Sequence, residues 1–265
     1  MPNTQPVYFF SHGSPMNAIE NNRFTADWLK LYQNSQATAL VIFSAHWHVP
    51  GIRITSAKKL ATIHDFHGFP DLLHQQDYPA ITASDTASEI NSLLNSHGYN
   101  VMLDESWGLD HGSWSLLKHL QPKADIPVIQ ISLNNQEKDA QWHYDMAKTL
   151  KPLRDKGIVF IGSGGIVHNI SKWMHSRAGD PINWAKDFDN AIAQAVDQRD
   201  INTLVNYQQL PFARDAVPTI EHYLPLIYCQ ALSDDNDIIQ HSPIALEDNK
   251  DLASYCSRSI RFSRF

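Results

Sequence analysis

The chain has 265 residues, of which 43% are hydrophobic and 18% charged, and its formal net charge is −7. This length and composition exclude a disordered chain, and the negative charge argues against binding to a nucleic-acid backbone. No apolar run approaches the ~20 residues of a membrane span, and the first residues lack a secretory-signal pattern. We therefore predict a cytoplasmic protein with no nucleic-acid or membrane partner.

Predicted strands and helices alternate along the chain. Apolar and β-branched runs predict strands at Val7–Phe10, Ala39–Ser44, Ile52–Thr55, Pro127–Ser132, Ile158–Ile161 and Ser259–Phe262. Apolar residues at three- and four-residue spacing predict helices at Arg23–Tyr32, Ala87–Leu94, Ser115–Leu120, Asp139–Leu153, Asn183–Val196 and Glu221–Leu232. No linker or internal repeat divides the sequence. We predict a single α/β domain over residues 1–265, with a mainly parallel central sheet flanked by helices.

Histidine is unusually frequent, with 14 copies against 11 glycines. Three predicted strands end in a turn that carries a histidine: His12 in "VYFFSHGSP", His46 in "ALVIFSAHWH" and, after a glycine-rich turn, His168 in "GIVFIGSGGIVHN". The carboxyl ends of parallel strands share one edge of a sheet, so we expect these three imidazoles to lie at that edge. Imidazoles without matching cysteines suit Fe, Zn, Cu or Ni rather than Mg or Ca.

Three further histidines lie in places that suggest function. His222 in "PTIEHYLP" opens the predicted helix Glu221–Leu232, whereas His64 in "TIHDFHGFP" and His111 in "WGLDHGSW" fall in irregular segments. These segments also carry aromatic residues, including Trp107, and therefore predict a pocket for a flat ring. We assign six other histidines to a solvated surface, namely His74, His97, His119, His143, His175 and His241.

Two competing motifs are incomplete. The turn "GSGG" at 162–165 lacks the last glycine and the acidic residue of a dinucleotide-binding fingerprint. The pairs "SHGSP" and "DHGSW" place serine near histidine but lack the nucleophile elbow of a serine hydrolase. Neither a nicotinamide cofactor nor a serine nucleophile is therefore predicted.

Six motifs spread over most of the chain together carry a family resemblance: "SHGSPMN", "SAHW", "TIHDFHGFP", "WGLDHGSW", "SGGIVHN" and "EHYLPL". In this order they resemble the class III extradiol ring-cleavage dioxygenases, in the 4,5-DOPA extradiol dioxygenase branch. The resemblance implies a non-haem Fe(II) enzyme that inserts both atoms of O2 into a catechol. With a DOPA-like substrate, 4,5-cleavage gives a seco-DOPA-type semialdehyde.

The resemblance also implies residue roles. His12, His46 and His222 match metal ligands, and His168 matches either the acid–base residue or a fourth ligand. His111 matches a pocket histidine that holds substrate oxygens or moves a proton. We further expect His64 and Trp107 to contact the substrate, and Zn(II) to replace Fe(II) readily during purification.

Three points stay open at this stage. A zinc-dependent hydrolase and a non-catalytic metal-binding module are alternatives on the same scaffold, because a four-histidine site also suits zinc. Lys172 and Arg177, which follow His168, are candidates for contact with the tail of the substrate. A monomer and a small homo-oligomer are equally admissible.

Overall fold

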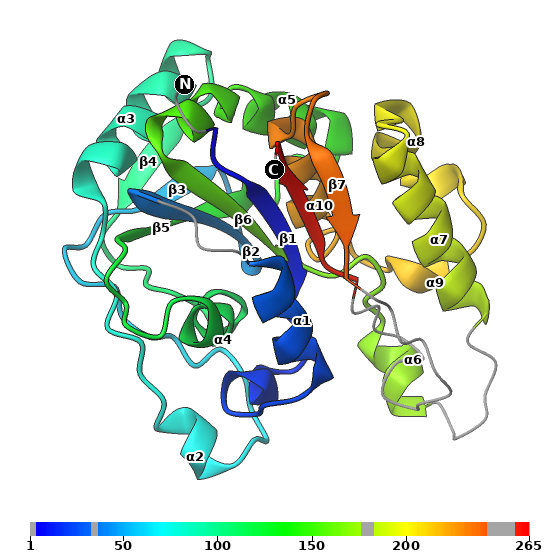
Figure 1. The fold of residues 1–265 in the computed structure, drawn as a ribbon, viewed down its shortest axis with the longest axis horizontal. Helices are drawn as coiled ribbons and strands as arrows, with labels where there is room; N and C mark the ends of the chain where they lie inside the picture. The colour runs from blue at the N-terminus through cyan, green and yellow to red at the C-terminus, as the bar shows by residue number, and fades with distance from the viewer. Residues whose placement is uncertain (1–3, 33–36, 176–182, 243–257, 265) are drawn as a thin grey trace.

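The central feature of the fold is one mixed sheet. The computed structural model describes residues 4–32, 37–175, 183–242 and 258–264 (Figure 1). Within these ranges eight strands form one sheet in the order β4-β3-β5-β2-β6-β1-β8-β7. Their bounds are β1 (Val7–Ser11), β2 (Ala39–Val49), β3 (Ile52–Thr55), β4 (Val101–Asp104), β5 (Val128–Asn134), β6 (Ile158–Gly164), β7 (Ile238–His241) and β8 (Ile260–Ser263).

The middle of the sheet is parallel. The four adjacent strands β5, β2, β6 and β1 pair in parallel with one another, and β3 pairs in parallel with β4. Antiparallel pairing joins β3 to β5, β1 to β8, and β8 to β7. The prediction of a mainly parallel sheet is confirmed. β4 and β7 were not predicted, because these four-residue edge strands are partly exposed and lack a buried apolar run.

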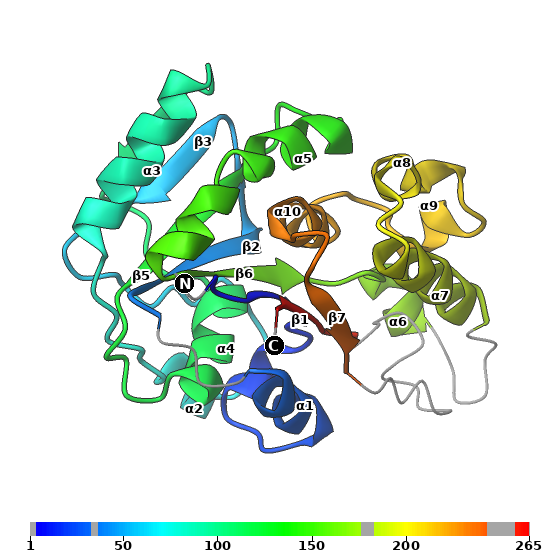
Figure 2. The same ribbon diagram turned by 45° about the horizontal axis from the view of Figure 1, so that its top comes forward.

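Helices cover both faces of the sheet. Along β1, Val7 and Phe9 face one buried core, whereas Tyr8 and Phe10 face the other. Figure 2 shows α3, α5 and α10 on one face and α1, α2 and α4 on the other. The helices are α1 (Arg23–Leu31), α2 (Asp71–His74), α3 (Ser84–Ser96), α4 (His111–Leu120), α5 (Ala140–Lys148), α6 (Ile170–His175), α7 (Asn183–Asp197), α8 (Ile201–Val205), α9 (Ala213–Ala216) and α10 (Leu224–Leu232), with 3-10 turns η1 (Pro15–Ala18), η2 (Lys151–Lys156) and η3 (Tyr207–Gln209).

Two helices have other boundaries than the sequence predicts, and a proline explains each difference. The predicted helix Asp139–Leu153 ends at Lys148, and η2 follows with Pro152 in its first turn. The predicted helix Glu221–Leu232 begins only at Leu224, with Pro225 in its first turn. Proline lacks the N–H that a helix interior needs but is tolerated in the first turn. His222 therefore lies in the turn before α10 and does not open the helix.

The assignment of His143 to the surface was wrong. This side chain is fully buried under α10, where Nδ1 lies 2.7 Å from the Tyr228 hydroxyl and Nε2 lies 3.1 Å from the Glu137 carbonyl oxygen. With both ring nitrogens paired, a polar ring is accommodated in the core.

Every helix in the described ranges is too short or too polar to cross a bilayer.

Candidate metal centre

His12 lies immediately beyond the carboxyl end of β1. Its backbone N–H donates to the Gly164 carbonyl oxygen at 3.3 Å, which extends the pairing of β1 with β6 by one residue. Gly13 then adopts φ +61°, a left-handed conformation that glycine takes without steric cost. The Asn17 side-chain amide donates to the His12 carbonyl oxygen at 3.0 Å. The turn thus directs the His12 imidazole along the sheet edge.

His46 lies inside β2 rather than beyond it. The predicted strand ended at Ser44, but β2 continues to Val49. Its register with β5 shifts between Phe43 and His48, so His46 occupies an irregularity in the ladder. Such irregularities bend a strand and change the direction of its side chains. This shift explains how a residue within a strand can face the same edge as His12.

His222 is held against the end of β6 by backbone contacts. Gly165 N–H donates to the His222 carbonyl oxygen at 2.8 Å. A Cβ atom placed on Gly164 would lie 2.2 Å from the same oxygen. The close approach of the two backbones therefore requires glycine at position 164.

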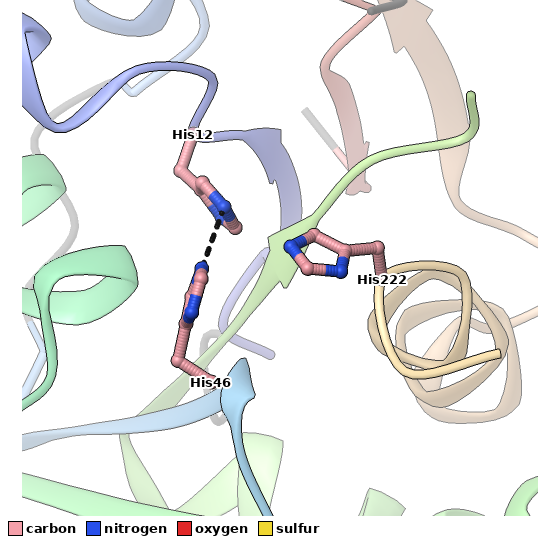
Figure 3. A group of neighbouring side chains, drawn as sticks. All are labelled: His12, His46 and His222. Carbon is pink, nitrogen blue, oxygen red and sulfur yellow. Dashed lines mark hydrogen bonds between the residues drawn. The ribbon is translucent and has the colours of Figure 1, made fainter. Parts of the chain in front are cut away.

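The three imidazoles converge on one point (Figure 3). One ring nitrogen from each of His12, His46 and His222 lies within 4.8 Å of the other two. The Nε2 atoms of His12 and His46 are 3.1 Å apart. His12 and His222 are buried, and His46 is partly buried. Three separate segments of the chain thus supply one cluster of nitrogen ligands.

Oxygen atoms beside the Nδ1 atoms determine which nitrogens face the centre. Ser163 Oγ donates to the Gly112 carbonyl oxygen at 2.6 Å and lies 2.9 Å from His12 Nδ1, so it accepts from that ring. Asp65 Oδ2 lies 3.3 Å from His46 Nδ1, and Glu221 Oε1 lies 3.4 Å from His222 Nδ1. These partners place the proton of each ring on Nδ1 and leave Nε2 as the acceptor.

The electrostatics of the cluster suit a cation. Burial, and then the neighbouring histidines, lower the pKa of His12 and His46 well below the usual value. Burial also lowers the pKa of His222, although Glu221 opposes it. Neutral rings are the form that binds metal. The His222 Nε2 atom is buried without a hydrogen-bond partner, and a metal ion would satisfy it. The donor set therefore fits Fe(II) or Zn(II).

Asp65 joins His46 to His111. Its Oδ2 atom lies 3.0 Å from His111 Nδ1, and its Oδ1 atom accepts the His111 backbone N–H at 2.8 Å. Burial alone would raise the pKa of Asp65, but hydrogen bonds from His111 outweigh burial and lower it. The carboxylate therefore stays ionised and holds both rings with Nδ1 toward it.

The first turn of α4 is tied to β2 beneath this pair. The structure places His111 as the first residue of α4, with Asp110 as the N-cap. The buried Asp110 carboxylate accepts from Ser44 Oγ at 2.7 Å and from the Gln130 amide. Burial, and then repulsion from Asp65, raises the pKa of Asp110 to about 6. These bonds fix the distance between His111 and the strand that carries His46.

His168 lies beside the cluster and stacks on it. Its ring is parallel to that of His222, with centroids 3.4 Å apart and an interplanar angle of 4°. Its backbone N–H donates to the Ala216 carbonyl oxygen at 2.8 Å. Burial, and then repulsion from His222, lowers the pKa of His168 to about 3, so the ring is neutral.

A cavity of about 700 Å³ opens onto the cluster. His12, His46, His111, His168 and His222 all line it, together with the aromatic residues Phe24, Phe66, Phe69 and Trp173. Its volume is typical of small-molecule sites, which span about 300–1,000 Å³. The chemistry available is therefore that of a flat ring held beside a nitrogen-rich cation site.

The structure places the two other predicted substrate contacts outside this lining. His64 Nε2 lies 2.9 Å from the Gln76 carbonyl oxygen, and its ring packs near that of Trp114. Trp107 stacks on Trp47 with centroids 5.3 Å apart. Among the described residues that line the cavity, neither is present. Their contact with a substrate stays a prediction.

Sequence reasoning missed the oxygen partners of the ligand rings. Asp65 lies within "TIHDFHGFP", between two histidines, and Glu221 precedes His222 directly. An acidic residue next to a candidate ligand was the available signal for both. Ser163 gave no such signal, because its contact with His12 depends on the register of β1 and β6.

Comparison with known proteins identifies the family to which this fold and histidine cluster belong. Residues 6–247 match a family described as the catalytic LigB subunit of aromatic ring-opening dioxygenase. That range includes all six histidines that line the cavity. The fold and the histidine cluster thus define an aromatic ring-cleaving dioxygenase. The chain belongs to the LigB family.

Similar proteins cover most of the chain. A protein of Escherichia coli K12 named "4,5-DOPA dioxygenase extradiol" is 39% identical over 228 residues, which span 84% of this chain and 83% of the relative. A protein of Beta vulgaris with the same name is 32% identical over 242 residues, which span 88% of this chain and 89% of the relative. The crystal structure of an uncharacterized E. coli K12 protein superimposes with a TM-score of 0.80 at 33% identity, covering 97% of this chain and 99% of the other.

Proposed function

We propose that the protein is a non-haem Fe(II)-dependent extradiol dioxygenase that cleaves a DOPA-like catechol between carbons 4 and 5 to a seco-DOPA-type semialdehyde. The convergence of one ring nitrogen from each of His12, His46 and His222 is the observation that supports this most strongly. The names of the E. coli and B. vulgaris relatives suggest the substrate class.

In this proposal His12, His46 and His222 hold the metal. When bound, Fe(II) supplies the redox chemistry that O2 insertion requires and acidifies a neighbouring hydroxyl. No carboxylate is among the three ligands, and the nearby Asp65 is already bonded to His46 and His111. An anionic catecholate therefore adds the negative charge that the ligand set lacks.

The residues around the metal position handle protons. His168 is a neutral ring on the cavity wall, and we assign it as the acceptor of a catechol hydroxyl proton. His111 has Nδ1 directed to Asp65, which leaves Nε2 to hold a substrate oxygen. Phe66 and Phe69 flank the same cavity and restrict water around the ring.

Metal analysis of anaerobically purified protein, combined with a catechol panel, tests the proposal. Reconstitution with Fe(II) should give O2 uptake and a new visible absorbance with DOPA or caffeate. No O2 uptake and no new absorbance with any catechol of the panel would contradict the proposed reaction. Turnover with zinc and without O2 would instead support the hydrolase alternative, which the family assignment disfavours. A cytoplasmic location and the oligomeric state stay predictions.

A further inference from the structure

An exposed carboxylate lies at the rim of the cavity. Glu20 follows η1, the short helix between His12 and α1, and is one of the residues that line the cavity. Asn22 Nδ2 donates to Glu20 Oε2 over a long 3.3 Å. Within the described part of the chain, Glu20 Oε1 has no hydrogen-bond or ion-pair partner. Most of the hydrogen-bonding capacity of this carboxylate is therefore available to a ligand.

A short polar chain links Glu20 to the metal centre. Asn22 Nδ2 also donates to Asn17 Oδ1 at 2.8 Å, and Asn17 Nδ2 donates to the His12 carbonyl oxygen at 3.0 Å. Asn17 is buried and Asn22 caps the first turn of α1, so both amides are fixed. Only two amide side chains separate the Glu20 carboxylate from the His12 backbone.

The charged side chains that line the cavity, histidines aside, are all negative. Among the described residues that line the cavity, Glu20 and Asp65 are the carboxylates, and none is a lysine or arginine. Asp65 is already bonded to His46 and His111. The aromatic faces of the lining, like a carboxylate, attract cations. A positively charged group on the ligand is therefore favoured at the rim, and a negatively charged group is disfavoured.

The two cations named as candidates for contact with the substrate tail do not alter this balance. Lys172 lies 3.2 Å from Asp215 and over the ring of Trp184, and it is not among the lining residues. Arg177 lies outside the described residues.

We propose that Glu20 is a specificity-determining residue that binds a protonated amine on the side chain of the catechol. This inference rests on the proposed function, because it places the catechol oxygens at the histidine cluster. The ring would then lie among the aromatic side chains, with its amine toward Glu20 in the same cavity. For an amino-acid catechol the ammonium group is the part that is recognised, and a catechol with an acidic side chain and no amine binds more weakly.

Binding measured by anaerobic calorimetry tests this, since without O2 the ligands are not consumed. Three catechols of different charge serve as probes: dopamine, 4-methylcatechol and 3,4-dihydroxyphenylacetate. Affinity should fall in that order. In Glu20→Gln the advantage of dopamine over 4-methylcatechol should shrink by about threefold to fivefold, as for a partly exposed ion pair. The affinity for 4-methylcatechol should not change.

Glu105→Gln is the matched control, because Glu105 is exposed, does not line the cavity, and loses the same charge. It should bind all three probes like the wild type. An unchanged dopamine advantage in Glu20→Gln, or equal affinities in the wild type, would overturn the role of Glu20 while catechol binding stands. If none of the three probes binds, the proposed function fails together with this inference.

Discussion

Gly164→Ala tests the placement of His222 directly. The added Cβ would lie 2.2 Å from the His222 carbonyl oxygen and 3.0 Å from Pro225 Cγ. Non-bonded heavy atoms prefer about 3.5–4.0 Å, so the backbone at His222 must retreat by about 1 Å or more. Metal sites tolerate shifts of only about 0.2 Å in ligand position. We expect metal affinity to fall by about 10–100-fold and stability by about 1–3 kcal/mol.

The assay is a calorimetric titration of metal-free protein with Zn(II), accompanied by thermal unfolding of the same samples. Gly165→Ala is the matched control, because its nearest contact would be an ordinary 3.4 Å from the Val167 carbonyl oxygen. That variant should bind metal like the wild type. Equal affinities for Gly164→Ala and Gly165→Ala in folded protein would refute the assignment of His222 as a ligand.

Three further substitutions address the remaining roles. His168→Ala should retain metal but lose turnover by about 10²–10⁴-fold, measured by metal analysis and O2 uptake; normal turnover or loss of metal would count against a proton-accepting role. Asp65→Asn should weaken metal binding by about 10–100-fold in the same titration, and an unchanged affinity would mean that the carboxylate does not orient His46. Burial lowers the pKa of His143 from 6.5 to about 4, so the folded state takes up this proton less readily than the unfolded chain. Its contribution to stability is therefore complete above pH 6.5, and up to about 3 kcal/mol is lost as the pH falls toward 4. Urea unfolding of the wild type should show this loss and His143→Gln should show less of it; identical losses would exclude His143 as the cause.

The sheet edge could be predicted because parallel strands read as apolar runs. His12 follows such a run directly, and its place at the edge requires only that β1 is parallel to its neighbour β6. The position of His46 could not be derived in the same way, because it depends on a shift of register between β2 and β5. Pairing between strands that are distant in sequence determines that shift.

The burial of polar residues could also not be predicted from the sequence. His143 and Asp110 are buried because partners from other elements satisfy them, and composition alone assigns such residues to the surface. Asp65 is similar, since its loop reaches both His46 and His111 only in the folded chain. Sequence therefore indicated which imidazoles could gather, whereas the oxygen atoms that orient them required the structure.

The distribution of the three proposed ligands along the chain also governs when metal can be acquired. His12 and His46 are 34 positions apart, and His222 lies far beyond both in the sequence, in the turn before α10. A nascent or unfolded chain therefore holds no complete site, and metal binds selectively to the folded state. A chain that ends before His222 therefore lacks one of the three histidines, and bound metal would in turn stabilise the complete fold against unfolding.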